Sequence, residues 1–294
     1  MATSANAYLS TAGSAAYVNP TLWSERIEQV ARENVVMPPL GVQDNRALGS
    51  SGVQINIAKN QAFTAATLTE GTATPVTTLA FNQVTVTFVE YGLAKQVGIQ
   101  ELSYGLKSMF NDITMNMGTA LAEKKDDVII AACTSGSANT VYAGGVTSGT
   151  VTAADIFSTD LFANGVTMLE VNKRKASSIV LHPNQKNPLL KDSQFVDASE
   201  YGSAEVVMNG EIGKYLGVKV ISYSRITSQT ENSSFTVYNA LMFGARPFVL
   251  AQKRSARLNW KEDSILDRAI TFAADESYGV SVLNSESIVL LKSV

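Results

Sequence analysis

Cysteine and histidine can act as metal ligand, nucleophile or base, and each occurs only once in this chain. The single cysteine is Cys133 and the single histidine is His182. This excludes a disulfide framework, a Cys/His zinc site and a zinc protease, and it leaves a histidine-based triad without a spare candidate. His182 lies between a short apolar run and Pro183, so we expect a strand-end side chain with a satisfied hydrogen bond. Cys133 follows Ile129 and Ile130, and we expect it to be a small buried apolar residue.

Adjacent carboxylates are the next candidates for acid–base chemistry. The pairs Asp126-Asp127 and Glu262-Asp263 each follow a lysine directly. A glycosidase needs two carboxyl groups that face each other across a cleft, and sequence adjacency does not indicate that arrangement. We therefore expect both pairs on a solvated face or in a turn. We predict no catalytic, cofactor-binding or metal-binding residue, and hence no enzyme.

A glycine pattern in the third quarter is the one candidate for a phosphate-binding loop. Gly210, Gly213 and Gly217 form the pattern GxxGxxxG. This pattern lacks the Lys-Ser/Thr of a Walker loop and the following acidic residue of a dinucleotide fingerprint. Glycines at turns that flank a short strand or helix explain it better, so no nucleotide cofactor is expected.

Charged residues concentrate in one late segment of the chain. Eight of them fall within 16 positions: Lys253, Arg254, Arg257, Lys261, Glu262, Asp263, Asp267 and Arg268. A nucleic-acid interface would interleave aromatic residues with the basic ones, but the segment contains only Trp260 and balances its cations with acids. A charged loop that forms ion pairs between subunits is therefore the favoured interpretation.

Composition indicates a folded protein whose surface is covered by other protein. Of the 294 residues, 45% are hydrophobic but only 17% are charged, and the net charge is −3. Soluble domains carry about 25% charged residues. The mildly acidic balance argues against a protein whose main task is to grip nucleic acid. No apolar run approaches the roughly 20 residues of a membrane span. Met1–Leu22 carries no charge and lacks the basic start of a signal peptide, so we expect an arm that is flexible or lies on a partner.

A long two-stranded finger is expected early in the chain. Apolar and polar residues alternate around Ile55 and again around Val86, which is typical of half-buried strands. About 25 Thr/Ala-rich residues separate the two strands, and Glu70 is the only charge between Lys59 and Glu90. An isolated two-stranded ribbon is only marginally stable in water, so we expect the finger to lie on a neighbouring subunit. A disordered surface loop is the alternative.

A spine-like helix follows, and the remaining elements mix helices with strands. Apolar residues recur at steps of three and four from about Glu101 to Cys133: Leu102, Leu106, Met109, Phe110, Ile113, Met117 and Leu121. Further helices are expected after Pro20 and over Leu161–Val171. Strands are expected at Leu93–Ile99, Ser178–Leu181, Val218–Ser222, Phe235–Phe243, Phe248–Ala251, Ile270–Phe272 and Ile288–Leu291. The elements do not repeat as βαβ units, so the predicted class is α+β.

This order of elements resembles the major capsid proteins of tailed bacteriophages, which have the Hong Kong 97-type (HK97-like) fold. The resemblance covers nearly the whole chain and rests on these segments: the uncharged arm, the finger, VTVTF from Val84 to Phe88, the long helix, SIVLHPNQ from Ser178 to Gln185, GEIGKYLGVKVISYSRI from Gly210 to Ile226, and the stretch from Arg257 to Leu291. It implies an arm over residues 1–50, an extended β-hairpin loop over 51–83, a peripheral domain over 84–135 and 248–279, and an axial domain over 136–247 and 280–294.

The resemblance implies a shell subunit that forms the hexamers and pentamers of an icosahedral head around double-stranded DNA. Its partners would be copies of itself, separate scaffolding and portal proteins, and a decoration protein, with packaged DNA contacted non-specifically, no membrane, and assembly in the host cytoplasm. The family's lysine–asparagine cross-link is poorly matched, since only Lys59 lies near the finger and Asn259 is the sole peripheral candidate. The residues expected at subunit contacts are Phe63, Leu68, Glu70, Lys253, Arg254, Arg257, Lys261 and Asp263.

Three other functions remain open at this point. An encapsulin-type compartment shares the fold but encloses an enzyme cargo. A hydrolase that uses Asp or Glu belongs to a different class and would be monomeric with an acidic cleft. An adhesin-like binding module is disfavoured because no export signal is found.

Overall fold

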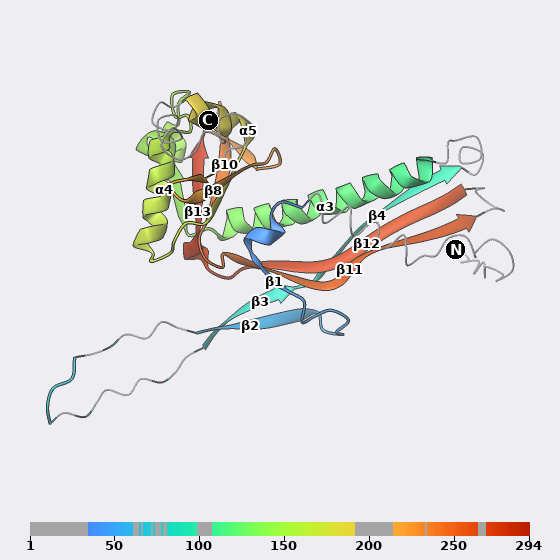
Figure 1. Cartoon of the computed structure of the whole chain (residues 1–294), viewed down its shortest axis with the longest axis horizontal. Helices are drawn as coiled ribbons and strands as arrows, with labels where there is room; N and C mark the ends of the chain where they lie inside the picture. The colour runs from blue at the N-terminus through green and yellow to red at the C-terminus, as the bar shows by residue number, and fades with distance from the viewer. Residues whose placement is uncertain are drawn as a thin grey trace. The chain divides into compact units, whose positions relative to one another are not determined.

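The computed structural model describes residues 35–60, 65, 67–71, 73, 78, 81–98, 108–191, 214–232, 234–263 and 269–294 (Figure 1). Within this part, the chain divides into two compact units. The first contains Glu90–Lys124 and Arg254–Ser277, and the second contains Val36–Val89, Lys125–Lys253 and Tyr278–Val294. The predicted helix after Pro20 and the first 34 residues of the arm lie outside the described residues.

The described elements mix helices and strands, as the α+β prediction requires. The α-helices are α3 (Ser108–Gly136), α4 (Thr159–Val171) and α5 (Pro183–Lys191), and the short 3-10 helices are η2 (Pro38–Leu40), η3 (Ala143–Gly145), η4 (Ser148–Thr150) and η5 (Ser285–Ser287). The strands are β1 (Val42–Asp44), β2 (Gln54–Asn60), β3 (Phe81–Thr87), β4 (Val89–Gly98), β5 (Asn139–Tyr142), β6 (Ser178–Leu181), β7 (Lys214–Tyr215), β8 (Val218–Ser222), β9 (Ser228–Glu231), β10 (Phe235–Phe243), β11 (Phe248–Asp263), β12 (Ala269–Val282) and β13 (Ile288–Ser293).

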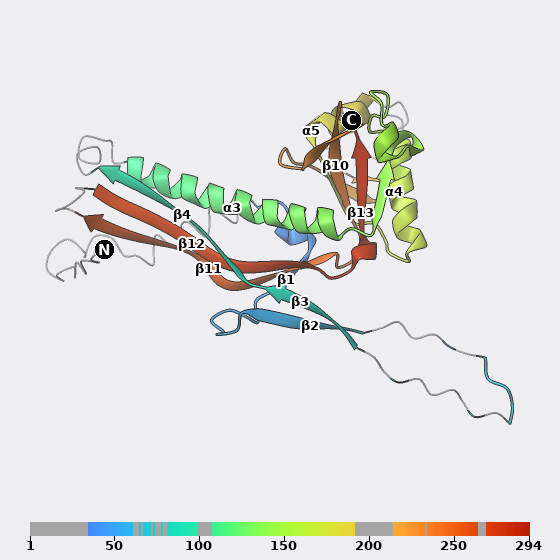
Figure 2. The same cartoon turned by 180° about the vertical axis from the view of Figure 1, so that it is seen from behind.

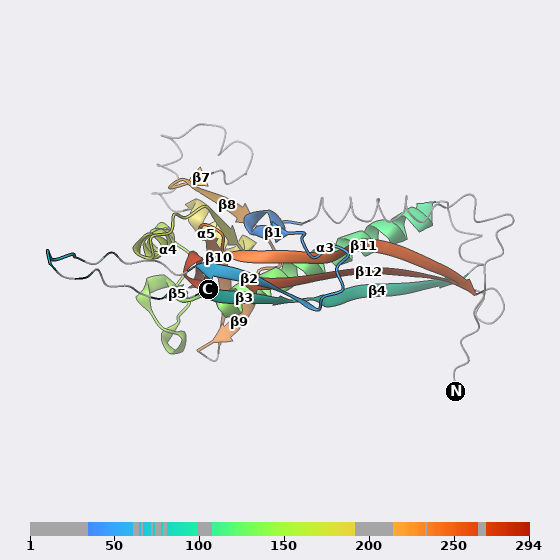
Figure 3. The same cartoon turned by 90° about the horizontal axis from the view of Figure 1, so that it is seen from below.

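These strands form three sheets. The first has the order β1-β11-β12-β4, and Figure 3 shows β4, β12 and β11 running side by side. The second has the order β5-β13-β10-β6-β8-β7, with β9 paired to β10. The third is the two-stranded ribbon β2-β3. Parallel pairs such as β6–β8 lie beside antiparallel ones such as β10–β13, so no repeating βαβ order exists among the described elements.

The first unit is held together by one apolar stripe of α3. Met117 and Leu121 are buried, and Ile113 is partly buried against the same cluster. Each of these residues is about one helical turn from the next. They pack with β-sheet residues that include Leu258 and Phe272. The predicted stripe is therefore confirmed for these three positions, while Leu102, Leu106 and the side chains of Met109 and Phe110 lie outside the described part of the chain. The helix extends to Gly136, three residues beyond the expected end.

The second unit has its core between α4 and the larger sheet (Figure 2). Ser158 caps α4 by accepting the backbone N–H of Leu161 at 3.3 Å. A Cβ added at Gly165 would lie 3.0 Å from the side chain of Leu291 and 3.1 Å from that of Met242. The glycine thus lets the helix approach β13 and β10 closely, which buries the apolar side chains of both layers.

Strands β11 and β12 are much longer than the apolar pattern predicted. Strand β11 runs through Lys253 to Asp263, where a charged loop was expected, so that prediction is wrong. Beyond Lys253 one face of β11 buries Ala256 and Leu258, while the side chains of Arg257 and Asn259 on the other face are exposed. A strand of this kind needs apolar residues at every second position only, so dense charge between them is compatible with a sheet.

Candidate functional site

The base of the finger is a regular antiparallel ladder on an apolar cluster. The register runs from Gln54 opposite Thr87 to Asn60 opposite Phe81. One face of the ribbon places Ile55, Ile57 and the buried Val86 against Val249 and Ala251 of β11. The other face presents uncharged polar side chains, among which the Thr85 hydroxyl donates to Asn56 Oδ1 at 2.8 Å. The two predicted finger strands are confirmed.

A glycine in β12 makes this close crossing possible. A Cβ on Gly279 would lie 2.3 Å from the Thr87 carbonyl oxygen and 2.7 Å from Val86 Cγ1. Both distances are far below ordinary contact, so only glycine fits beneath β3 at this point.

The outer part of the finger exposes apolar and acidic side chains. Leu68 is 64% exposed and Phe81 is 61% exposed. Glu70 is also exposed, and Gly71 follows it with a positive φ of 83° in a turn. Phe63, a predicted contact residue, lies outside the described residues. A role of Leu68 and Glu70 at subunit contacts stays a prediction.

The predicted cationic contact residues lie on β11, and two of them already pair within the chain. Arg254 forms ion pairs with Glu90 at 3.1 Å and with Asp275 at 2.5 Å. Arg257 Nε lies 3.0 Å from Asp275 Oδ1. These pairs join β11 to β4 and β12 inside the first unit, which is a different role from the predicted pairing between subunits.

The other charged residues of this segment have different surroundings. The Lys253 ammonium lies 5.9 Å from the centroid of the Phe88 ring, within cation–π range. Lys261 and Glu262 are exposed on the same strand. The side chain of Asp263 and all of Asp267 and Arg268 lie outside the described part of the chain.

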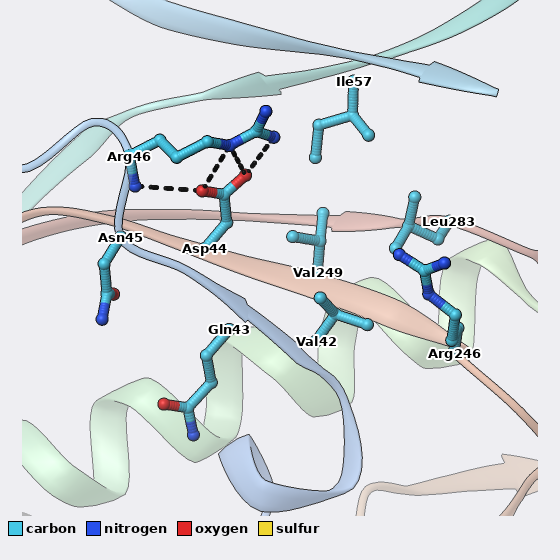
Figure 4. A pocket seen from close by; sticks show the side chains of 9 residues that line it. All are labelled: Val42, Gln43, Asp44, Asn45, Arg46, Ile57, Arg246, Val249 and Leu283. Atoms are coloured by element: carbon cyan, nitrogen blue, oxygen red, sulfur yellow. Dashed lines mark hydrogen bonds and ion pairs between the residues drawn. The ribbon is translucent and has the colours of Figure 1, made fainter.

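A hollow of about 480 Å³ lies where the finger meets β1 and β11 (Figure 4). Its apolar lining comes from Val42, Ile57, Val249 and Leu283, whose side chains gather in the middle of the view. The remaining lining residues are Gln43, Asp44, Asn45, Arg46 and Arg246. In Figure 4 the guanidinium groups of Arg46 and Arg246 lie apart from each other around these side chains, so the hollow has an apolar floor and a polar rim.

At one end of the hollow, the charges of Arg46 and Asp44 neutralise each other. Arg46 Nε lies 3.0 Å from Asp44 Oδ1 and 3.1 Å from Oδ2, and its backbone N–H also donates to Oδ1 at 3.0 Å. The side-chain hydrogen bond from Arg46 holds the pKa of Asp44 below its usual value. At the other end, Arg246 is exposed and has no carboxylate within 4.0 Å among the described residues.

Sequence reasoning missed this hollow because its residues come from four separate segments. Arg246 lies in the turn Gly244–Pro247 between two apolar strands, with a positive φ of 51°. Gly244 and Pro247 indicate a turn that exposes Arg246. No feature of the neighbouring sequence indicated that Val42 and Leu283 would lie beside it.

The first carboxylate pair is not uniformly solvated, so that prediction is wrong for Asp126. Asp126 is fully buried, and it accepts the backbone N–H groups of Val36 at 3.0 Å and Met37 at 3.2 Å. Burial raises its pKa despite these bonds and one from the Tyr223 hydroxyl. Asp127, by contrast, forms a partly exposed ion pair with Arg225, with 2.5 Å between Oδ2 and Nη2. Asp126 therefore anchors the chain just before η2 to α3.

A buried ionic cluster in the larger sheet was also missed. Lys292 Nζ lies 2.8 Å from Glu231 Oε1 and donates to the Tyr142 hydroxyl at 3.2 Å, and that hydroxyl also lies 3.1 Å from Glu231 Oε1. Burial alone would raise the pKa of Glu231, but hydrogen bonds from Lys292 and Gln229 outweigh it and lower this pKa. Burial likewise opposes the charge of Lys292, yet its bonds to Glu231 and Tyr142 raise its pKa overall. Both groups are therefore held in their charged forms.

The lone histidine is hydrogen-bonded at the end of a strand and the lone cysteine is buried, as predicted. His182 Nδ1 accepts the backbone N–H of Asn184 at 3.2 Å, and its ring stacks on Tyr238 with 4.2 Å between centroids. Cys133 is fully buried, and burial raises the pKa of its thiol far above the ordinary value. Among the described residues, no group of three or more His, Cys, Asp or Glu side chains could hold a metal ion. Within the same residues, no helix has the length and hydropathy that a membrane crossing requires.

Comparison with known structures defines the class of the fold. The capsid of cyanophage Pam1 matches with a TM-score of 0.72 at 13% identity, covering 90% of this chain and 91% of that one. The head of Helicobacter pylori bacteriophage KHP40 matches with a TM-score of 0.69 at 12% identity, covering 100% and 95%. Mycobacterium phage Che8 gives a TM-score of 0.66 at 18% identity, covering 87% and 90%. Together with the order of elements, these matches identify the α+β, Hong Kong 97-type fold of phage capsids.

The family follows from the sequence itself. The model of the phage capsid protein family matches residues 40–293, which is most of the chain. The chain belongs to this family of phage capsid proteins. Among curated proteins, none matches it. The resemblance drawn from the order of elements is thereby confirmed.

Proposed function

We propose that copies of this chain assemble into the hexamers and pentamers of a closed icosahedral phage head that encloses double-stranded DNA. The observation that carries the proposal is family membership over residues 40–293, combined with a finger whose outer residues are exposed. Many weak contacts between identical copies add up through multivalency to a stable shell.

The finger is the element that most needs a neighbour. A two-stranded ribbon is marginally stable by itself, and among the described residues the apolar packing of this one is on the face toward β11. Exposed Leu68 and Phe81 and the uncharged polar face would be covered by an adjacent copy. Phe63, Leu68 and Glu70 are the finger residues to which we assign this contact.

The charged residues of β11 would take two roles in assembly. Arg254 and Arg257 hold β11 to β12 through Asp275, and both side chains remain partly exposed. Lys253, Lys261 and Asp263 are assigned to ion pairs with a neighbouring copy. We retain the division into arm, extended loop, peripheral domain and axial domain as part of this proposal.

Other partners follow from the same assembly. A scaffolding protein, a portal protein and a decoration protein would contact the shell, and packaged DNA would be contacted without sequence preference. The net charge of −3 agrees with weak, non-specific DNA contact. Assembly would take place in the host cytoplasm before the chain becomes part of the virion.

The test is direct. Purified protein viewed by negative-stain electron microscopy should contain closed shells, and deletion of Thr67 to Pro75 should abolish them while circular dichroism remains unchanged. Native particles should contain DNA. Particles that contain an enzyme cargo instead would favour the encapsulin alternative, and a monomer that forms no shells under any condition would overturn the proposal.

A further inference from the structure

The hollow beneath the finger combines an apolar floor with one cation, Arg246, that has no carboxylate partner within the described part of the chain. Val42, Val249 and Leu283 line it from three separate segments, and Ile57 contributes from the ribbon itself. Its volume of about 480 Å³ is enough for one or two side chains of another chain.

The cation at the rim is held in place by its backbone. Arg246 has a positive φ of 51°, and its carbonyl oxygen accepts the Asn284 amide at 3.1 Å. Pro247 follows it and accepts the backbone N–H groups of Leu283 and Asn284 at 3.0 and 3.1 Å. The turn is therefore fixed to the segment that lines the hollow, while the guanidinium group is exposed.

The electrostatics of the hollow favour an acidic occupant. The bidentate pair of Arg46 with Asp44 cancels the charge at one end. Arg246 then supplies the net charge of the lining, because the six remaining lining residues are uncharged. A carboxylate beside apolar side chains would complement this surface, since charge-assisted bonds to guanidinium are strong and directional.

The finger of the same protein carries this chemistry at its outer end. Glu70 is the only charged residue between Lys59 and Glu90, and it lies two positions after Leu68. Two residues of chain span at most about 7 Å, so the side chains of Leu68 and Glu70 are close enough to enter one site together. Leu68 and Glu70 are both exposed, and no described residue beyond Ile57 in the finger lines the hollow of its own chain.

We infer that Leu68 and Glu70 of a second copy occupy this hollow. Leu68 packs on Val42, Val249 and Leu283, and the Glu70 carboxylate pairs with Arg246. This inference rests on the proposed assembly into a shell and identifies the receiving surface for the finger. The proximity of Ile57 means that a docked finger also contacts the base of the finger that receives it, so neighbouring fingers stabilise each other in series.

A charge swap tests the pair. Glu70→Arg and Arg246→Glu should each weaken the contact by about tenfold and greatly lower shell yield, because each places like charges together. The double variant Glu70→Arg/Arg246→Glu should restore the yield, measured by sedimentation. Lys219→Glu makes the same charge change as Arg246→Glu on an exposed strand outside the hollow and should leave yield unchanged.

A disulfide test separates contacts between copies from contacts within one copy. One preparation carries Glu70→Cys and a second carries Arg246→Cys, and native Cys133 is buried and should not react. Co-assembled particles should yield disulfide-linked dimers on non-reducing gels, whereas each preparation alone should yield few. The inference would be overturned if the wild type formed shells but the mixed cysteine variants gave no dimers and the charge-swap double variant did not restore the yield. The proposed function would then still stand. Absence of wild-type shells would overturn the proposed function instead.

Discussion

Replacing Gly279 with alanine should displace the base of the finger. The added Cβ would lie 2.3 Å from the Thr87 carbonyl oxygen, where ordinary contact begins at 3.4 Å. Relief therefore requires β3 to move away from β12 by roughly 1 Å, which separates the ribbon from the apolar cluster beneath it. Overpacking of this kind costs about 1–3 kcal/mol of unfolding free energy.

Two measurements check the expected shift. The melting temperature of the unassembled chain should fall by about 2–4 °C for each kcal/mol lost. Backbone amides of β3 (Phe81–Thr87) should exchange with deuterium faster, since the ladder to β2 loses its support. Shell yield should fall in parallel, because the finger would leave its base at a changed position.

Gly149→Ala is the matched control. No heavy atom lies within 4 Å of a Cβ at Gly149, and its backbone is not in the left-handed region, so the same chemical change should alter stability by less than about 0.5 kcal/mol. If Gly279→Ala matched this control in both melting temperature and β3 exchange, the steric argument for the crossing would be refuted.

Two further predictions concern buried charges in the second unit. Lys292→Met should lower the free energy of unfolding, measured with denaturant, by about 3–5 kcal/mol because it leaves Glu231 buried without its cation, and adding Glu231→Gln should recover part of this loss. The pKa of Glu231 is lowered and that of Lys292 is raised, so the stability that the pair contributes should be constant near neutral pH. It should fade as acid protonates Glu231 and as alkali deprotonates Lys292. Asp126→Asn should cost about 1–3 kcal/mol, because one of the Val36 and Met37 N–H groups loses its acceptor, and hydrogen exchange at those two amides should speed up. Burial raises the pKa of Asp126, so the stability that this residue contributes should be largest below about pH 4 and should decline as pH rises through the folded-state pKa. Urea unfolding at several pH values should show this decline in the wild type and not in Asp126→Asn.

Local periodicity made several elements predictable from sequence. The alternation around Ile55 and Val86 predicted the paired strands β2 and β3, and the spacing of Ile113, Met117 and Leu121 predicted the buried stripe of α3. These signals are readable because each strand or helix face repeats within a few residues. The boundaries of β11 were not predictable in the same way, since its charged face hides the alternation of Ala256, Leu258 and Trp260 on the other face.

The sequence by itself determined which segments lack charge, where the finger strands and the long helix lie, and that the chain has a single cysteine and a single histidine. Only the tertiary structure decided which side chains meet. Register places Lys292 opposite Tyr142, 150 positions earlier, and the contacts that bury Asp126 join it to backbone 90 positions away. The hollow around Arg246 likewise unites four segments. The physical reason is range: propensity and periodicity act between near neighbours, whereas burial and ion pairing depend on distances that only the folded chain creates.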